Sequence, residues 1–381
     1  MSFVRPLLFV TALIALPLSA RAAERTLPVP PPASPPVAAP LPEPAPPFVE
    51  GSAATATPAG LSGLKVQPGL EVFVEYNLRL TRASTGNEWF HSFEIPRAHG
   101  SLRASYGPAQ ARLVVEAVRS ASEGALLGVA GDSLVLRLRD ASAGYRQGEW
   151  LSLDAGVIPT LTVPELDGSF NLRAVAPTPL ESTGLSSPAD LGATARVTFP
   201  RRYGFAAVGA YNGEGYTNRE LNRGKNLELA AEIHPLPEGP LAPLGVFASY
   251  VIGSEGTAHA RADRLTVALL WQGKRLRGGA SFTHAWGVGE RADQRSILLD
   301  AFLRAEPIDR LIFGVRGFSW QRDLEASGDR VNELTGAAGY HVVAPLEAFL
   351  AVTRTFPEAR AAAALPGLDH WTFRVLSRVV F

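Results

Sequence analysis

Apolar and polar residues alternate with a period of two along most of the chain. Over residues 70–81 one face of this pattern is apolar throughout and the other is largely polar. The same alternation returns around residues 194–199, 226–234, 264–272 and 296–304. Because successive side chains of a β-strand point to opposite faces, this period predicts strands and not amphipathic helices. Soluble β-sandwiches alternate in the same way, so the pattern alone does not separate a soluble sheet from a membrane sheet.

The alternation predicts sixteen strands, and most are about 10 to 14 residues long, which suits a tilted membrane crossing better than a soluble sheet. Their expected ranges are 69–82, 93–106, 110–120, 132–145, 149–159, 191–200, 203–212, 225–236, 243–253, 262–273, 275–286, 294–306, 309–320, 331–342, 345–356 and 369–381.

The joins between these strands are alternately short and long. The short joins include Gly107-Pro108, Arg146-Gln147-Gly148, Arg201-Arg202, Gly273-Lys274, Glu306-Pro307 and Ala344-Pro345. The long joins are 83–92, 121–131, 160–190, 213–224, 254–261, 287–293, 321–330 and 357–368. Outer-membrane barrels have short periplasmic turns and long extracellular loops. The sequence therefore predicts an all-β fold, a transmembrane antiparallel β-barrel of about sixteen strands.

The last strand has an apolar face and ends on an aromatic residue. That face contains Trp371, Phe373, Val375, Val379 and Phe381, and is interrupted by Ser377. A terminal Phe on an alternating strand resembles the signal by which outer-membrane barrels are recognised for assembly. We expect Phe373, Val375, Val379 and Phe381 to carry that signal, and we expect the barrel assembly machinery and outer-membrane lipid to be partners.

The N-terminal region differs from the rest of the chain. Arg5 precedes a mostly apolar stretch, and Ala20-Arg21-Ala22 offers small residues at cleavage-site spacing, so residues 1–23 are predicted to be a signal peptide. Pro and Ala dominate the following residues, which is typical of an extended linker. We expect a Pro/Ala-rich periplasmic linker over residues 24–68 and an outer-membrane barrel over residues 69–381.

Composition and charge argue against several other classes of protein. Cysteine is absent, so no disulfide framework holds the fold. The formal charge is zero, and removal of residues 1–23 leaves −2, so no strong basic field is available for nucleic acid. The histidines lack metal-ligand spacing, and Ser281 and His284 point to opposite faces of one strand. We expect no enzyme, no cofactor and no metal site.

Several short stretches resemble, in order and spacing, the phosphate-selective porin O and P family over residues 73–381. They are residues 93–98, 138–141 followed by 153–157, 190–192, and 211–215 followed by 224–226. The resemblance implies a sixteen-stranded barrel that assembles as a homotrimer and passes solutes through a constricted, charged lumen. In such channels the third long loop, here 160–190, often folds inward.

Phosphate selectivity is not carried over from this family. Its phosphate-selective members are expected to combine an arginine ladder with a lysine cluster. The chain has only three lysines, Lys65, Lys225 and Lys274.

The polar strand faces supply candidate lumen residues, because the apolar faces are expected to meet lipid. We expect a cationic wall facing the third long loop, formed by Arg103, Arg112, Arg137 and Arg139. Arginine keeps its charge and offers a fork of donors to carboxylate or phosphate, so such a wall would concentrate anions. The alternative is that these arginines pair with acids such as Glu75 and Glu116 as a solvated wall.

Three acids of the third long loop, Glu165, Asp167 and Glu181, would face that wall and create a transverse field, or else lie on the surface. The leading hypothesis is an outer-membrane porin for passive diffusion of small hydrophilic solutes, with an anion preference. The alternative is a non-conducting barrel that serves as a structural anchor or adhesin, with its N-terminal tail tethered to the cell wall.

Overall fold

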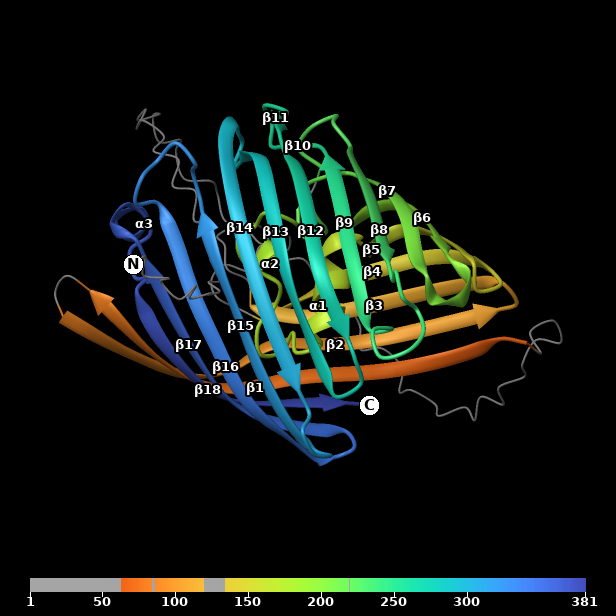
Figure 1. The fold of residues 1–381 in the computed structure, drawn as a ribbon, viewed down its shortest axis with the longest axis horizontal. Helices are drawn as coiled ribbons and strands as arrows, with labels where there is room; N and C mark the ends of the chain where they lie inside the picture. The colour runs from red at the N-terminus through yellow and green to blue at the C-terminus, as the bar shows by residue number, and fades with distance from the viewer. Residues whose placement is uncertain (1–62, 84–85, 120–133, 219) are drawn as a thin grey trace, which may run out of the picture. The chain divides into compact units, whose positions relative to one another are not determined.

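The structure, a computed structural model, describes residues 63–83, 86–119, 134–218 and 220–381. In these residues sixteen strands close into one antiparallel barrel, in which β1 pairs with both β2 and β18 (Figure 1). No helix in the described ranges is both long enough and apolar enough to cross a membrane. The predicted sixteen-stranded barrel is confirmed, whereas the signal peptide and most of the linker lie outside the described residues.

The strands of the barrel are β1 (Lys65–Ala83), β2 (Gly86–Tyr106), β3 (Ala109–Arg119), β4 (Leu134–Gln147), β5 (Leu151–Pro159), β6 (Ala189–Thr198), β7 (Gly204–Tyr211), β8 (Asn226–Ile233), β9 (Leu244–Ile252), β12 (Asp263–Gln272), β13 (Leu276–Val288), β14 (Arg291–Ala305), β15 (Leu311–Gln321), β16 (Arg330–Val343), β17 (Leu346–Pro357) and β18 (His370–Val380). The remaining elements are α1 (Thr162–Phe170), α2 (Pro179–Ser182), a 3-10 turn (Pro200–Arg202), the small hairpin β10 (Ser254–Glu255) and β11 (Ala260–Arg261), and α3 (Ala359–Ala364).

Two of the predicted long joins were wrong, because strands occupy them. Residues 86–92 belong to β2, which continues to pair with β1 until Ala83 faces Gly86. Ring packing supports this extension, since the rings of Tyr76 and His91 lie 6.1 Å apart. Residues 287–293 are mostly strand, because Gly289 and Glu290, with φ of 59° and 63°, form a tight turn. The barrel also begins at Lys65 and not at Gly69.

The inner face of the barrel is polar on one side and apolar on the other. Large apolar side chains point inward and are buried from β9 to β17, namely Phe247, Leu270, Leu298, Phe302, Ile312, Phe318, Trp320, Val331 and Phe349. On this side of the barrel the inward faces therefore carry apolar core residues as well as the polar residues that the alternation predicts. These side chains are buried because the loop after β5 covers them.

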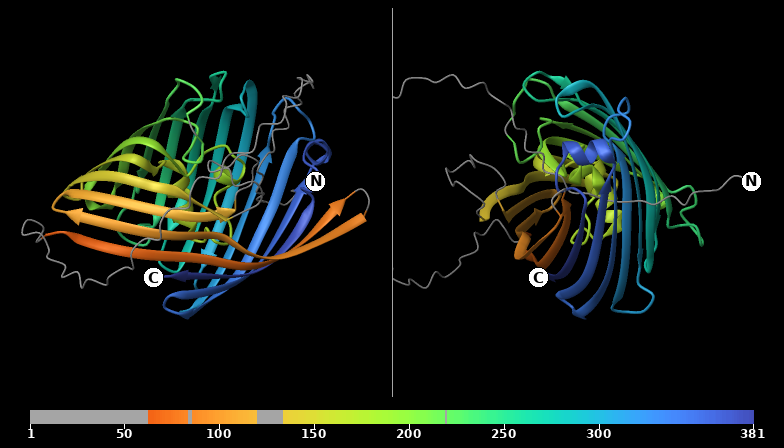
Figure 2. Two further views of the ribbon diagram at one scale, coloured as in Figure 1. Left: turned by 180° about the vertical axis from the view of Figure 1, so that it is seen from behind. Right: turned by 90° about the vertical axis from the view of Figure 1, so that its left-hand side faces the viewer.

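The loop between β5 and β6 lies inside the ring of strands (Figure 2). Its buried residues Val163, Leu166 and Phe170 join the core of the inner wall, and α1 contacts β12, β13 and β14. Asn171 ends α1 in the left-handed conformation, with φ of 54°. The loop then returns along the same wall through α2, which starts at Pro179.

Candidate lumen constriction

Apolar contacts fix the loop between β5 and β6, called the inner loop (160–188), against the barrel wall. The rings of Phe170 and Phe302 lie 5.4 Å apart. Leu172 packs directly on Gly314, where an added Cβ would lie 2.6 Å from the Leu172 side chain. A glycine at this position therefore permits the close approach of loop and strand.

Arginines of the same wall donate hydrogen bonds to main-chain carbonyls of the inner loop. The contacts run from Arg264 to Leu185 O (2.9 Å), from Arg277 to Gly168 O (3.1 Å), from Arg316 to Ala176 O (3.4 Å) and from Arg374 to Val175 O (2.6 Å). All four point inward, as the alternation predicts. At the buried residues Val175, Ala176 and Leu185 they satisfy loop carbonyls that would otherwise lack partners.

Arg316 is fully buried and makes further contacts besides its hydrogen bond to the inner loop. Its guanidinium donates to both carboxylate oxygens of Asp300, at 3.1 and 2.7 Å. It also lies 5.2 Å from the ring centroid of Phe170 and 5.4 Å from that of Phe302. A buried charge is tolerated when it is paired in this bidentate way.

Glu228 of β8 holds the first turn of α1. Its carboxylate accepts hydrogen bonds from Leu161 N and Thr162 N, both at 2.9 Å, and from Thr162 Oγ1 at 2.6 Å. The first N–H groups of a helix have no partner inside the helix, and a negative charge favours that end. Glu228 therefore fixes the point at which the inner loop enters the lumen.

Arg137 and Arg139 of the predicted wall lie around Glu116, a fully buried carboxylate of β3. Glu116 contacts Arg97 (3.6 Å), Arg137 (2.5 Å), Arg139 (3.7 Å), His99 (3.2 Å) and the hydroxyl of Tyr216 (2.7 Å). The alternative raised from the sequence, pairing with Glu116, thus describes the contacts of these two arginines.

The three acids of the inner loop have separate partners. Glu181 lies 3.6 Å from Arg97 of β2 and 2.5 Å from Arg173, so it joins the inner loop to the opposite wall. Burial alone would raise the pKa of Glu181, but Arg173 and Arg97 outweigh it and lower that pKa.

Asp167 is buried within the loop. It accepts a hydrogen bond from Thr178 N at 2.7 Å and pairs with Arg173 and with Arg316, the latter at 3.7 Å. Burial raises the pKa of Asp167 in spite of these cations.

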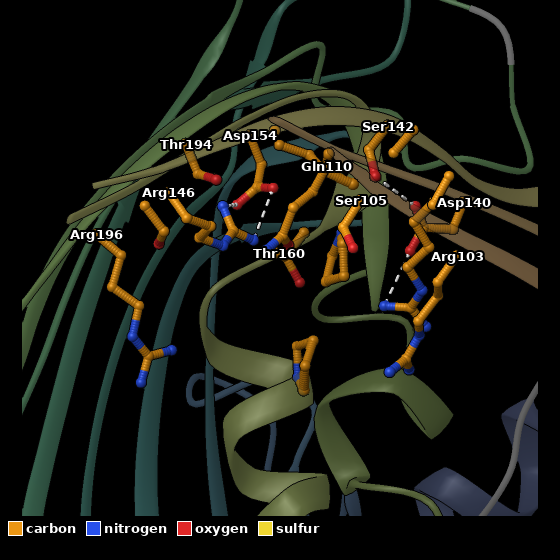
Figure 3. A pocket seen from close by; sticks show the side chains of 18 of the residues that line it. Arg103, Ser105, Gln110, Asp140, Ser142, Arg146, Asp154, Thr160, Thr194 and Arg196 are labelled. Carbon is orange, nitrogen blue, oxygen red and sulfur yellow. Dashed lines mark hydrogen bonds and ion pairs between the residues drawn. The ribbon is translucent and has the colours of Figure 1, made fainter. Parts of the chain in front are cut away.

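A cavity of about 630 Å³ lies between strands β1 to β6 and the start of α1 (Figure 3). Arg103 and Arg112 line it, together with Lys65, Arg146 and Arg196, so five basic side chains meet three acidic ones. The acids are Asp140, Asp154 and Glu165. Serine, threonine and glutamine side chains fill much of the remaining wall (Figure 3).

Ion pairs neutralise three of the five cations. Arg112 lies 3.2 Å from Asp140, Arg146 lies 2.9 Å from Asp154, and Arg196 lies 3.4 Å from Glu165. Within the described part of the chain, no carboxylate lies within 4.0 Å of Arg103 or Lys65. The cavity wall therefore carries a net positive charge.

The expected cationic wall is thus divided into two groups. In the register of β2 and β3, Arg103 faces Arg112, whereas Glu116 faces His99 four residues further along. At roughly 3.3 Å per residue, the two groups lie about 13 Å apart along the strands. Arg103 and Arg112 face the cavity, and Arg137 and Arg139 surround Glu116.

The alternation of the sequence did not predict two residues of the site. Asp140 follows Leu136 and Leu138 on a face expected to be apolar, but a bulge in β4 leaves Arg139 unpaired opposite Val114 and Val115, which shifts the register and turns Asp140 inward. The only signal was a charge on an apolar face. Tyr216 lies in a loop and has no periodic context that would place it beside Glu116.

The C-terminal strand has the geometry expected from its pattern. Phe373, Val375 and Phe381 are exposed on the outer face, and the rings of Trp371 and Phe373 are stacked at 6.2 Å. The main chain of Phe381 closes the barrel by exchanging hydrogen bonds with Leu70. The role of this strand in assembly stays a prediction.

Comparisons with known proteins agree on the fold. No protein-family model and no curated protein matches the chain. The OmpF of Salmonella typhi, solved in complex with daunomycin, matches with a TM-score of 0.64 at 12% identity, covering 84% of this chain and 98% of that one. An anion-selective porin from Comamonas acidovorans matches with a TM-score of 0.56 at 11% identity, covering 83% and 100%.

The OprB of Pseudomonas putida, solved at low pH, matches with a TM-score of 0.52 at 12% identity, covering 83% and 92%. The narrower resemblance to the phosphate-selective porin O and P family is not confirmed by these comparisons. The three lysines also lie apart, because Lys65 starts β1, Lys225 pairs with Glu220 in a loop, and Lys274 lies in a turn. The chain has the sixteen-stranded β-barrel fold of outer-membrane porins.

Proposed function

We propose that the protein is a porin of the bacterial outer membrane, through which small hydrophilic solutes diffuse passively with a preference for anions. The observation that carries this proposal is the polar cavity beside the inner loop, with five basic and three acidic side chains. Excess positive charge in a narrow, water-filled space raises the local concentration of anions.

The environment of the barrel follows from its surface. The outward side chains of β1 to β18 are mostly apolar and exposed, which suits contact with outer-membrane lipid. The C-terminal strand, with Phe373, Val375, Val379 and Phe381, serves as the signal for the barrel assembly machinery. Residues 1–23 act as the signal peptide, and the Pro-rich linker stays in the periplasm. One solved neighbour is described as a trimer, which supports a homotrimer here.

The constriction proposed for this pore lies where the inner loop meets β2. Glu181 contacts Arg97 at that point, and Tyr216 approaches Glu116 and Arg137 close by. Solutes would pass on the cavity side, because the opposite side is filled by packed apolar side chains. The transverse field is carried by Glu165 and Glu181 on the loop and by arginines on the wall.

Single-channel recording tests this function. The refolded protein in a planar bilayer should open in steps, and a KCl gradient should give a reversal potential shifted toward the anion. A correctly folded, heat-modifiable barrel without steps would contradict a porin and would favour the structural anchor or adhesin. Steps with a cation-shifted potential would retain the porin and refute the anion preference.

A further inference from the structure

Two guanidinium groups lie side by side on the cavity wall without full charge compensation. Arg103 of β2 and Arg112 of β3 face each other directly in the antiparallel register. Like charges at such a pair repel each other. Arg112 has Asp140 at 3.2 Å, and Arg103 has no carboxylate within 4.0 Å among the residues that the structure describes. A single carboxylate for two guanidiniums leaves positive charge open to the cavity.

Neutral hydrogen-bonding side chains surround this pair at the same level of the barrel. Gln67 faces Arg103 across β1 and β2, and Ser142 faces Arg112 across β3 and β4. Two residues further along β2, Ser105 faces Gln110. All of these residues line the cavity, and Figure 3 labels Ser105, Gln110 and Ser142 on its wall. Hydroxyl and amide groups both donate and accept hydrogen bonds, so they suit the hydroxyls of a solute.

The remaining chemistry of the cavity narrows the class of solute. Among the residues that the structure describes, the cavity lining contains no aromatic side chain, so the apolar face of a neutral sugar has no described ring on which to stack. Its volume of about 630 Å³ is within the range that holds a small organic molecule with some water. Charge and hydroxyl groups are therefore the features of a solute that this wall can recognise.

We propose that Arg103 and Arg112 form a binding subsite for the carboxylate of small hydroxylated acids, whose hydroxyls contact the neutral side chains around the pair. A guanidinium presents two parallel N–H groups that match the two oxygens of a carboxylate. The proposal rests on the proposed function, because a solute reaches the subsite only if the barrel conducts.

The second arginine group does not form such a subsite. Arg137 donates to Glu116 at 2.5 Å and to the hydroxyl of Tyr216 at 3.0 Å, and Arg139 also lies near Glu116. Arg97 and His99 contact the same carboxylate. Because these donors already bind the carboxylate of Glu116, the carboxylate of a solute would have to displace Glu116 in order to bind them.

The test is the block of single-channel current by gluconate, added to the full-length protein in KCl. Glucose supplies the same hydroxyl pattern without charge, and inorganic phosphate supplies an oxyanion without the carbon chain. We expect gluconate to block at lower concentration than either. The double variant Arg103→Gln, Arg112→Gln should raise the half-blocking concentration of gluconate about tenfold or more, because it removes charge-assisted hydrogen bonds.

Two further variants separate a site from a diffuse field. Arg146→Gln removes one positive charge from the same cavity but leaves the pair intact, and we expect it to weaken the block by less than about threefold, because the Arg146 guanidinium is bound to Asp154 and does not hold the solute. The double variant Arg103→Lys, Arg112→Lys keeps both positive charges but loses the paired N–H donors of the two guanidinium groups. We expect it to weaken the block as well.

Three results would overturn the subsite. They are equal block by gluconate and glucose, equal block by gluconate and phosphate, and an equal loss of block in Arg146→Gln and in the double glutamine variant. Failure of the proposed function looks different, because no stepwise openings would be recorded at all. Open channels that ignore gluconate would refute the subsite and leave the porin standing.

Discussion

The two sides of the barrel interior are made from the same alternating strands but carry opposite chemistry. From β1 to β6 the inward side chains are arginine, serine, glutamine and aspartate around a cavity. From β9 to β17 they are large and apolar, such as Phe302 and Phe318, and the inner loop buries them. An apolar wall facing water would be unfavourable by roughly 25 cal/mol for each Å² exposed, so the loop position is stabilised by the wall it covers.

This difference determines where the lumen remains open. Three kinds of contact attach the inner loop to the apolar wall. The ring of Phe170 packs on that of Phe302, Arg316 is held in place by its ion pair with Asp300, and arginines donate hydrogen bonds to loop carbonyls. Toward the polar wall its described ion pairs are that of Glu181 with Arg97 and that of Glu165 with Arg196 at the cavity edge. The loop therefore behaves as part of the apolar wall, and the described cavity lies along the polar wall.

The largest effect is expected from Arg316→Ala on the apolar side. The variant leaves the Asp300 carboxylate buried without its partner, which typically costs about 3–5 kcal/mol. The inner loop should detach, so that trypsin cleaves the folded barrel after Arg173 and the single-channel current becomes larger and noisier.

Two variants control for this result. Arg275→Ala removes an arginine whose ion pair with Asp309 is exposed, and it should leave both cleavage and current unchanged. The double variant Arg316→Met, Asp300→Leu removes the pair together and should restore much of the protection, because no buried charge is left over. A protected loop in Arg316→Ala would show that the apolar contacts alone hold it.

A smaller effect is expected where the inner loop enters the lumen. Glu228→Ala removes the acceptor of Leu161 N and Thr162 N and leaves these donors buried without a partner, at a cost of about 2 kcal/mol. Hydrogen exchange of residues 161–166 should become faster while the strands stay protected. Glu238→Ala, in the exposed turn between β8 and β9, is the matched control and should change nothing. Faster exchange across the whole barrel would instead indicate a general loss of stability.

The strands could be predicted from the sequence because their signal is local. Alternation located all sixteen barrel strands, including the C-terminal strand predicted over residues 369–381, since each strand carries its own two-faced pattern. The division of the interior could not be predicted in this way. Phe302 and Leu270 look like ordinary strand residues until the distant loop residue Phe170 is placed against that wall. Such contacts depend on closure of the barrel and not on neighbours in sequence.

The same limit applies to the lumen arginines. Alternation placed Arg103, Arg137 and Arg316 inward, but it could not separate the arginine that faces the cavity from those that bind Glu116 or Asp300. Which partner each guanidinium meets is decided by register across several strands and, at Asp140, by a bulge. The sequence therefore predicted which arginines point inward, but it did not predict which partner each of them binds.

The smallest effects concern two acids of the inner loop whose pKa values shift in opposite directions. Glu181 contacts Arg97 and Arg173, which lower its pKa from the ordinary value of 4.5, so its ionised form stabilises the docked loop. That contribution is present above pH 4.5 and is lost as the pH falls through the lowered pKa. Burial raises the pKa of Asp167 from 3.8, so its contribution is present below that pH and is lost as the pH rises through the raised pKa.

Neutral variants of the two acids should therefore differ in sign. At pH 7, Glu181→Gln should weaken docking by about 1 kcal/mol, and the gap to the native protein should close as the pH falls to about 3. Asp167→Asn imitates the protonated acid and should leave docking at pH 7 unchanged or slightly stronger. Hydrogen exchange of residues 161–182 across this pH range measures both. If the two variants weakened docking equally at every pH, Asp167 and Glu181 would serve the loop through hydrogen bonds alone, and charge would play no part in joining the loop to the polar wall.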